Sequence, residues 1–335
     1  MNKSVFQSQL EDDECVAALR EVVDARSTEA PIRMGKTAEA VRTDDLAKGI
    51  RSLQTGRVDL EMPSRAEAIV MRHNYPSLLI LDGTYEEPEN PHWKRVLDPH
   101  QPAIQRSIAS VGRVDLTGHR DYTWVGTLWR IADDILITNR HVASIFAKAK
   151  RDGGYRIQKR LKVFADFKEE HRSTEQLEFL VKSIVSIEPT SSIDMALLRL
   201  DGGARDLPGE PVPLRPGRSA DEYLAVVGYP AWDHRNDAGD MARIFRDIFN
   251  VKRLAPGKVM NENHSADVFT HNCTTLGGNS GSLVLDIESG GAVGLHFAGS
   301  ALSQNYAVKA EAIEEAMRRN SVTGYRIVDG SRTDG

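Results

Sequence analysis

Three residues of the types that carry out acyl transfer occur in three separate segments of the 335-residue chain. His141 follows an apolar run in ILITNRHVAS, Asp194 precedes one in SSIDMALLRL, and Ser280 lies in the glycine-rich TTLGGNSGSLVLD. A serine hydroxyl needs an adjacent base before it can act as a nucleophile at neutral pH. Histidine titrates near neutrality, and a carboxylate behind it fixes the imidazole tautomer and stabilises the imidazolium ion. The order His, Asp, Ser therefore predicts a nucleophilic triad.

The glycines around Ser280 predict a second part of the same site. They allow the backbone to turn sharply, so that the amides of Gly278 and Ser280 can point at an oxyanion developing on a reacting carbonyl. A donor of this kind contributes about 3–4 kcal/mol in acyl transfer. Each segment alone is also typical of an ordinary turn or core position. Their joint occurrence at strand edges indicates a catalytic site.

The elements that must position these residues are short β-strands. From about residue 109, apolar runs alternate with turn residues, and few helical patterns lie between them. Such a pattern predicts an antiparallel sandwich or barrel. The expected strands are 110–116, 124–131, 135–139, 161–167, 183–188, 195–200, 223–229, 257–260, 267–271, 281–286, 292–297 and 305–308. The run AVKAEAIEEAMRRN, residues 307–320, predicts a C-terminal helix.

The first part of the chain has a different pattern. Apolar residues recur at helical spacing within 8–26 and 38–53, so we expect helices up to about residue 60. Residues 77–83 predict a short buried strand. We interpret residues 86–93 as a loop, because two prolines disfavour both a helix interior and a central strand.

Composition narrows the class of protein. With 40% hydrophobic and 27% charged residues, the chain is neither disordered, nor collagen-like, nor a coiled-coil rod. A net charge of −5 gives no overall attraction to nucleic acid or anionic lipid, so we expect neither as a partner. Cys15 and Cys273 cannot form a disulfide framework. The N-terminus lacks an apolar signal, and no run could span a bilayer, so we expect a cytoplasmic protein.

The blocks TNRHV, IDMALLRL and GNSGS resemble the signature blocks of the trypsin-like (chymotrypsin-fold, S1) serine peptidases. The resemblance covers roughly residues 109–320 and is closest to the bacterial V8-like glutamyl endopeptidase and HtrA-like branches, which carry TN-x-HV and GNSG. It implies a mainly β fold of two six-stranded antiparallel barrels with a C-terminal helix, here preceded by a helical N-terminal extension. His141 and Asp194 would come from the first barrel, and Ser280 from the second.

The resemblance implies a domain organisation. Residues 1–108 would form an N-terminal accessory segment, 109–325 the peptidase domain, and 326–335 a tail. Zymogen-activated relatives carry an aspartate just before the nucleophile, and it pairs with a newly formed N-terminus. This chain has Asn279 there, which cannot form that ion pair. We therefore expect activity without N-terminal cleavage.

The resemblance also implies substrate-binding positions. Thr275, five residues before the serine, and His296, in VGLHFAG, would shape the primary specificity pocket. A hydroxyl and an imidazole can hold a substrate carboxylate, which favours acidic P1 residues. Alternatively, His296 only fills a pocket wall. Phe297, Ala298 and Gly299 would form the edge strand that pairs with the substrate backbone.

We therefore expect an intracellular, regulated serine endopeptidase that uses no metal or organic cofactor. Its partners would be a protein or peptide substrate and a regulatory partner bound through the N-terminal segment. Two alternatives remain open, namely a catalytically silent binding module on the same fold and an esterase with the same triad. His264, His271 and Cys273 do not form a ligand set with zinc spacing.

Two further segments are distinctive. Residues 148–162 contain seven basic residues, which indicate a solvated surface loop or a docking patch for an acidic partner. Residues 231–259 form a long insertion in which MARIFRDIF predicts a short helix near the cleft. Loops of this length are often functional, so a gating role is one hypothesis.

Overall fold

The computed structural model describes residues 75–151, 153–202, 207–217, 222–232, 238–300 and 304–328. The helices expected within 8–26 and 38–53 lie outside these residues, as does Cys15. Within the described ranges, no helix has the length and apolar character needed to cross a bilayer.

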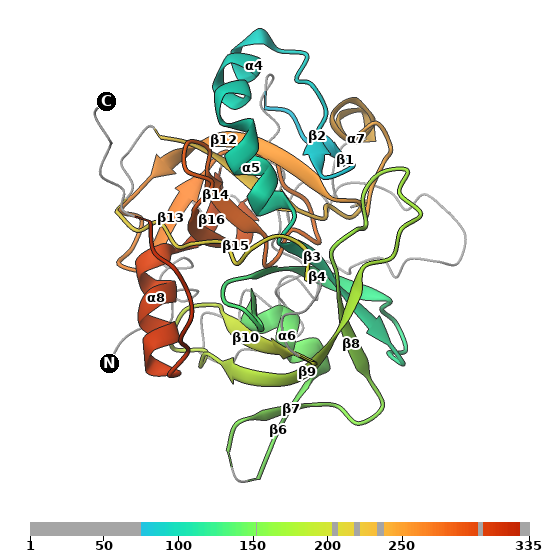
Figure 1. Cartoon of the computed structure of the whole chain (residues 1–335), viewed down its shortest axis with the longest axis vertical. Helices are drawn as coiled ribbons and strands as arrows, with labels where there is room; N and C mark the ends of the chain where they lie inside the picture. Colours follow the sequence, from blue (N-terminus) through green and yellow to red (C-terminus); the bar gives the residue numbers. More distant parts are fainter. Residues whose placement is uncertain are drawn as a thin grey trace, which may run out of the picture.

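Six antiparallel strands close into a first barrel in the order β10-β5-β4-β3-β8-β9 (Figure 1). Their bounds are β3 Val111–Thr117, β4 Trp124–Arg130, β5 Ile135–Thr138, β8 Lys162–Asp166, β9 Glu178–Ile187 and β10 Ala196–Leu200. Leu128 and Leu136 point into the barrel, whereas their neighbours Trp129 and Ile137 belong to the larger core outside it. Burial on both faces explains why β5 (ILIT) is a continuous apolar run and why β10 (ALLRL) is nearly one.

A second barrel follows, with the strand order β11-β14-β15-β16-β13-β12 and a β11–β12 pairing that closes it. Its strands are β11 Tyr223–Gly228, β12 Arg253–Asn261, β13 Val268–His271, β14 Leu283–Asp286, β15 Ala292–Ser300 and β16 Gln304–Lys309. Leu224 and Val226 fill its interior, and Ala225 and Val227 face the large core. Each barrel therefore has an inner core and shares an outer one. The mainly β, two-barrel fold implied by the resemblance is confirmed.

Residues 75–108 pack on the second barrel. Strand β1 Leu78–Leu81 pairs with β12 and with β2 Thr84–Tyr85, and the short 3₁₀ helix η2 Asp98–His100 joins α4 Pro91–Leu97 to α5 Gln101–Ile108. Trp93 and Ile104 from these helices enter the large core. The interpretation of 86–93 as a loop is wrong for its last residues. Pro91 occupies the first turn of α4, where its missing N–H costs nothing, and Asn90 caps the helix.

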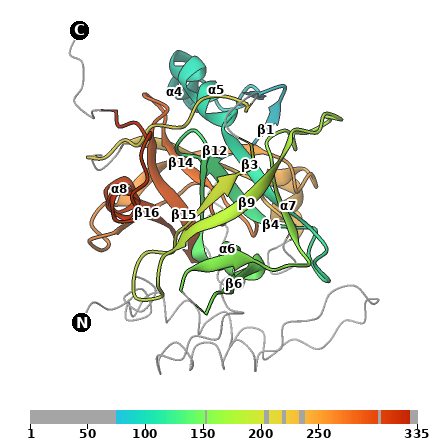
Figure 2. The same cartoon turned by 60° about the horizontal axis from the view of Figure 1, so that its bottom comes forward.

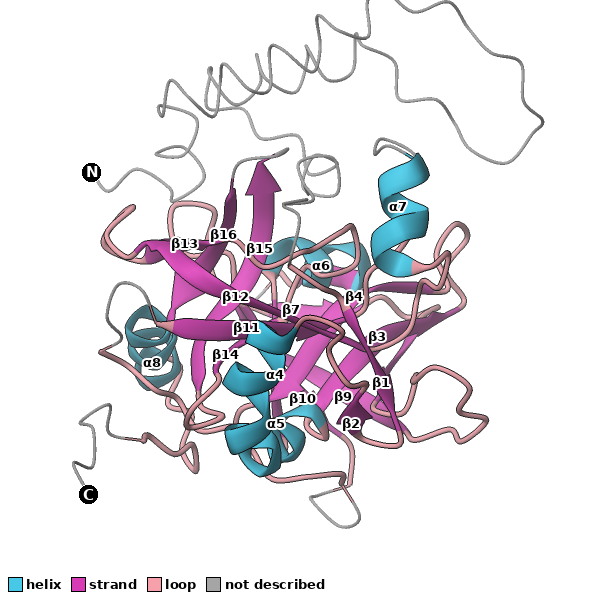
Figure 3. Ribbon diagram, turned by 90° about the horizontal axis from the view of Figure 1, so that it is seen from above, coloured by secondary structure: helices cyan, strands magenta, loops and turns pink. Residues whose placement is uncertain are grey.

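Four more elements complete the fold. Helix α6 Arg140–Phe146 joins β5 to a projecting hairpin, β6 Ala147–Ala149 and β7 Tyr155–Ile157. Helix α7 Ala238–Phe245 lies within the long insertion, where the sequence predicts a helix. The sequence also predicts the C-terminal helix α8 Ala310–Arg319, which Figure 3 shows in cyan at the margin of the strands. It packs against β15 and β16. Glu188, after β9, accepts hydrogen bonds from Arg319 and Asn320.

Candidate active site

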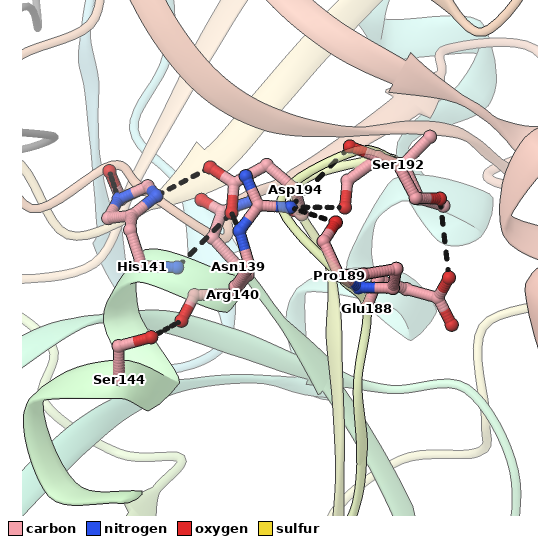
Figure 4. A network of polar contacts seen from close by, with 10 residues as sticks. Asn139, Arg140, His141, Ser144, Glu188, Pro189, Ser192 and Asp194 are labelled. Carbon is pink, nitrogen blue, oxygen red and sulfur yellow. Dashed lines mark hydrogen bonds and ion pairs between the residues drawn. The ribbon is translucent and has the colours of Figure 1, made fainter. Parts of the chain in front are cut away.

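The structure brings His141, Asp194 and Ser280 into one hydrogen-bonded chain. The His141 Nε2 atom lies 2.7 Å from Ser280 Oγ, and His141 Nδ1 lies 2.6 Å from Asp194 Oδ2. The backbone N–H of His141 also donates to Asp194 Oδ1 at 3.1 Å, so both carboxylate oxygens face the histidine. Figure 4 shows the contacts between His141 and Asp194. The arrangement can carry a proton from the serine hydroxyl to the imidazole.

Local structure at the end of β5 fixes the position of the histidine. The strand ends at Thr138, and Asn139 is the extended residue that precedes α6. The buried Asn139 amide donates to the Asp194 carbonyl at 2.9 Å, which ties the strand-to-helix turn to the aspartate segment. Arg140 donates to the carbonyls of Pro189 and Ile193 at 3.0 and 2.9 Å (Figure 4). The turn therefore holds the histidine and the aspartate segment in register.

Asp194 is buried and remains an anion. Burial alone would raise the pKa of its carboxyl, but the His141 imidazole, the hydrogen bonds from that residue and the Arg140 guanidinium hold the pKa below its usual value. The Arg140 Nε atom lies 4.0 Å from Asp194 Oδ1. An ionised carboxylate at this place stabilises a positive charge on His141.

The turn that carries Ser280 depends on two glycines with left-handed backbone. Gly278 has φ +88°, and a Cβ on it would lie 2.4 Å from the Tyr229 carbonyl oxygen. Gly281 has φ +87°, and a Cβ there would lie 2.1 Å from the Thr127 carbonyl oxygen. Only glycine fits such positions without strain. The turn thus gives Ser280 its orientation, with the Gly278 amide two residues before it.

Strand β4 of the first barrel forms hydrogen bonds to this turn, which belongs to the second barrel. The Thr127 amide donates to the Ser280 carbonyl at 2.9 Å, and its hydroxyl donates to the Gly278 carbonyl at 2.9 Å. Thr138 in turn donates to the Thr127 carbonyl at 2.7 Å. Because these carbonyls are held by Thr127, the peptide units Gly278–Asn279 and Ser280–Gly281, which flank the Asn279–Ser280 unit, are fixed before any substrate arrives. Such preorganisation is what an oxyanion site requires.

Asn279 is buried and satisfied within its own turn. Its amide group donates to the Leu276 carbonyl at 3.2 Å, and its side-chain oxygen accepts from the Ser282 hydroxyl at 3.2 Å. Both polar groups of the Asn279 side chain are thus bonded to uncharged partners. The turn therefore needs no ion pair to hold this conformation.

The two expected pocket residues differ in what their polar atoms do. His296 is 1% exposed, and its Nε2 atom has no hydrogen-bond partner among the described residues. Its Nδ1 lies 3.3 Å from Nε2 of the buried His271. Burial, together with a smaller electrostatic effect of the nearby His141, lowers the pKa of His296 to about 3. His296 is therefore neutral near pH 7.

Thr275 directs its hydroxyl elsewhere than expected. The hydroxyl donates to Asn305 Oδ1 at 2.9 Å, and Asn305 donates to the Cys273 carbonyl at 2.5 Å. In this structure the Thr275 proton is engaged by the wall of the second barrel. Of the two residues, His296 is the one that offers an unpaired polar atom.

The expected edge segment lies at the end of β15. The β14–β15 ladder ends at the pair Leu283–Leu295, while β15 continues to pair with β16 as far as Ser300 and Gln304. Phe297, Ala298 and Gly299 thus extend beyond the last β14 partner. An extended peptide could add there as a strand.

Helix α7 supports the segment before the serine. Met241 and Phe245 pack against Leu276, one residue after Thr275. Arg253 donates to the carbonyls of Phe245 and Ile248 at 2.7 and 2.9 Å, which fixes the end of the helix. The long insertion therefore buttresses the pocket wall in this structure.

Potential metal ligands occur elsewhere. Asp115, Asp166 and Glu178 place carboxylate oxygens within 4.8 Å of one another, but Arg113 binds Asp115 through two nitrogens at 2.6 and 2.8 Å. His271 uses both ring nitrogens, one toward His296 and one to accept the Cys273 amide at 3.3 Å. The Asp115 carboxylate and both ring nitrogens of His271 are therefore already engaged by protein groups.

The structure brings together the three side chains that the sequence predicts as a triad, but the sequence did not indicate the residues that position them. Arg140, Asn139 and Thr127 act through backbone carbonyls, and Ser282 and His271 through single hydrogen bonds. Only the adjacency of Asn139 and Arg140 to His141 gave a signal. Thr127 contacts residues about 150 positions away, which no local pattern could reveal.

Comparison with known proteins supports the same interpretation. The profile of the family described as "Trypsin-like peptidase domain" matches residues 126–295. No curated protein shows significant similarity to the chain. Among solved structures, the M. tuberculosis protease Rv3671c, in an inactive form, has 18% identity and a TM-score of 0.41, covering 66% of this chain and 93% of that one. The serine endoprotease from Yersinia pestis has 15% identity and a TM-score of 0.43, covering 66% of each chain.

Proposed function

Because the chain belongs to the trypsin-like peptidase family, we propose that it is a serine endopeptidase that hydrolyses peptide bonds of protein substrates through an acyl-enzyme. The observation that carries this proposal is the continuous chain from Ser280 through His141 to Asp194, with contacts of 2.7 and 2.6 Å. An accidental cluster would not place both nitrogens of one imidazole between a hydroxyl and a buried carboxylate.

In the acylation step, Ser280 Oγ attacks the scissile carbonyl carbon while its proton passes to His141 Nε2. The carbonyl oxygen becomes an oxyanion, which the amides of Gly278 and Ser280 stabilise. His141 then gives the proton to the leaving amine, the C–N bond breaks, and an ester to Ser280 remains. Asp194 stays ionised and stabilises the imidazolium throughout.

Deacylation repeats these roles with water as the nucleophile. His141 accepts a proton from water, the resulting hydroxide adds to the ester carbonyl, and the Gly278 and Ser280 amides again receive the oxyanion. The C–O bond to Ser280 breaks, and the proton on His141 returns to the serine oxygen. No redox or metal-dependent step is needed in this cycle.

We further propose that the chain belongs to the V8-like or HtrA-like branch and is active without N-terminal cleavage. The neutral hydrogen bonds of Asn279 to Leu276 and from Ser282 support this proposal. They supply internally what a new N-terminus supplies in zymogen-activated relatives. This proposal would be contradicted if only an N-terminally processed form of the chain showed amidase activity.

An acidic P1 residue is the substrate preference that the pocket supports best. The unpaired Nε2 of His296 can donate to a substrate carboxylate, and His271 holds the opposite nitrogen at 3.3 Å. A buried donor without a partner costs about 1–3 kcal/mol, which a carboxylate ligand would recover. Thr275 would have to release Asn305 before its hydroxyl could contribute.

We also propose that the enzyme works in the cytoplasm and that the N-terminal segment restrains it or recruits its partner. A protease in its own cytosol must be restrained. The sequence has two cysteines, and the one that the structure describes, Cys273, is a free buried thiol. This supports a reducing compartment. The substrate is a protein or peptide, and the regulatory partner would bind residues of the accessory segment.

The experiment that tests this function exposes a proteome-derived peptide library to the full chain and sequences the new termini. We expect cleavage by wild type, none by Ser280→Ala, and enrichment of Glu and Asp at P1. Ser144→Ala is the matched control, because that hydroxyl donates to the Arg140 carbonyl and does not face Ser280. Cleavage mainly after Lys, Leu or Ala would refute the P1 preference. No Ser280-dependent cleavage would favour the silent binding module, and ester hydrolysis alone would favour the esterase.

A further inference from the structure

The segment that follows α6 carries a dense, one-sided charge. Residues 147–162, here called the basic hairpin, comprise β6, β7 and the stretch leading to β8. They contain seven basic residues and one acidic residue, Asp152. Six of the basic side chains are exposed, namely Lys148, Lys150, Arg151, Lys159, Arg160 and Lys162. None of these six forms an ion pair with a carboxylate in the part of the chain that the structure describes.

The basic hairpin is fixed to the helix that carries His141. Strand β6 begins directly after α6, and Gln158 returns to the helix end through two hydrogen bonds, to Phe146 O at 2.9 Å and Ile145 O at 3.0 Å. Figure 2 shows α6 beside β6 at the lower edge of the first barrel. A seven-residue helix is about 10 Å long, so the cations begin about 10 Å from His141.

Its other end adjoins a second element of the active site. A Cβ on Gly118, in the β3–β4 loop, would lie 2.3 Å from the Arg160 carbonyl, and Thr117 pairs with Lys162. Trp124, the first residue of β4 after that loop, packs against Gly278, two residues before Ser280. The cations therefore connect two structures that flank the reacting residues.

We propose that the basic hairpin is a docking surface for acidic segments of polypeptide substrates, lying outside the residues that hold the scissile bond. This inference rests on the proposed peptidase function. An extended peptide advances about 3.3 Å per residue, so carboxylates about four to eight residues from the scissile bond would reach the hairpin. A polypeptide is favoured over a nucleic acid because the substrate of the proposed peptidase is itself a polypeptide, held at His141, about 10 Å from the first of these cations. Unpaired cations would accelerate its association and fix its register.

The binding test uses the full chain with Ser280→Ala, so that no substrate is consumed. A fluorescein-labelled polyglutamate peptide is the probe, and polyglutamine of equal length is the neutral reference. We expect Lys148→Gln/Lys150→Gln/Arg151→Gln to weaken polyglutamate binding about tenfold or more, with a loss of salt dependence. The matched control is Lys94→Gln/Arg318→Gln/Arg326→Gln, which removes the same charge from exposed positions elsewhere and should leave binding unchanged.

Equal weakening by the two triple variants would overturn the proposal, because binding would then follow net charge alone. Tighter, hairpin-dependent binding of an oligothymidylate of the same length would also overturn it in favour of a nucleic acid. A kinetic test uses the catalytically intact chain and two substrates with the same cleavage site. One substrate carries an acidic extension and the other a glutamine extension, placed at either end of the cleavage site. The hairpin variant should lower kcat/KM for the acidic substrate only. If the wild-type chain cleaves neither substrate but still binds polyglutamate through the hairpin, the peptidase function is refuted and the docking surface is supported.

Discussion

At the scale of single residues, the site depends on which side chains keep or lose a charge. Asp194 stays ionised although it is buried, because His141 and Arg140 face it. His296 stays neutral even in mildly acidic solution, because burial and His141 lower its pKa from 6.5 to about 3. The blocks TNRHV, IDMALLRL and GNSGS allowed the three triad candidates to be predicted, and the structure brings them into hydrogen-bonding contact. The sequence could not show that the Thr275 hydroxyl donates to Asn305, since 30 residues separate them.

Replacing Asp194 by asparagine tests the charge behind the histidine. The amide keeps the shape but would donate toward His141 Nδ1 or favour the wrong tautomer, so we expect kcat to fall about 10⁴-fold. Thermal unfolding should show a folded protein, and peptide hydrolysis gives the rate. Asp201→Asn, at an exposed carboxylate paired with Lys182, should keep full activity. A loss under tenfold would exclude Asp194 from the triad.

The depressed pKa of His296 predicts a pH-dependent stability. The unfolded histidine takes up a proton near pH 6.5, whereas the folded one resists until about pH 3. The unfolded state then binds more protons in this interval, so the free energy of unfolding falls as the pH drops from about 6.5 to about 3. We expect His296→Gln to lose less stability than wild type over this range in urea titrations. The exposed His92→Gln should behave like wild type, and identical slopes for all three would contradict the assignment.

At the scale of elements, the active site is assembled by contacts between the barrels. Thr127 on β4 binds the backbone on both sides of the second-barrel turn. Short apolar runs allowed the twelve barrel strands to be predicted, and helical spacing allowed the C-terminal helix to be predicted. Strands β2, β6 and β7 were not predicted, because they are short and β6 and β7 contain no buried residue. The start of α4 at Pro91 was missed, because proline was weighed as a helix breaker and not as a first-turn residue.

Lys252 offers a test of how three segments are joined. Its buried Nζ donates to Phe167 O at 2.7 Å and Ile108 O at 3.3 Å, linking β12, β8 and α5. Burial lowers the pKa of this amine to about 8, although Glu170 opposes the shift. Between about pH 8 and 10.5 the unfolded state binds more protons. The free energy of unfolding of wild type, relative to Lys252→Met, should therefore rise across this interval. A flat or falling difference in denaturant titrations would refute the buried-cation link.

At the scale of the whole molecule, the described residues that precede the first barrel are part of the folded body. Residues 75–108 are built into the second barrel through β1, Trp93 and Ile104. The boundary drawn at residue 108 from the sequence came from the change in strand pattern. That pattern could not reveal pairing between residues as far apart in sequence as Leu78 and Leu254. The far end of the chain also crosses back, since α8 residues bind Glu188 beside the Asp194 segment.

Deleting residues 1–60 tests the proposed role of the accessory segment, because the cut leaves β1 and its pairing intact. If the segment restrains the enzyme, kcat/KM on a short peptide should rise severalfold. If it recruits a partner, pull-down of that partner should be lost. The melting temperature provides the control for folding of the barrels. Unchanged activity and unchanged partner binding together would refute a regulatory role.

The most direct test of the central claim is active-site labelling with a fluorophosphonate probe, followed by peptide mapping. We expect one phosphonyl group per chain, attached to Ser280. Labelling should be lost in Ser280→Ala, be slowed by orders of magnitude in His141→Ala, and stay unchanged in Ser144→Ala. Wild type that is labelled should lose its amide hydrolysis in proportion. Absence of labelling in folded wild-type protein, or labelling that persists in Ser280→Ala, would contradict the claim that Ser280 is the activated nucleophile.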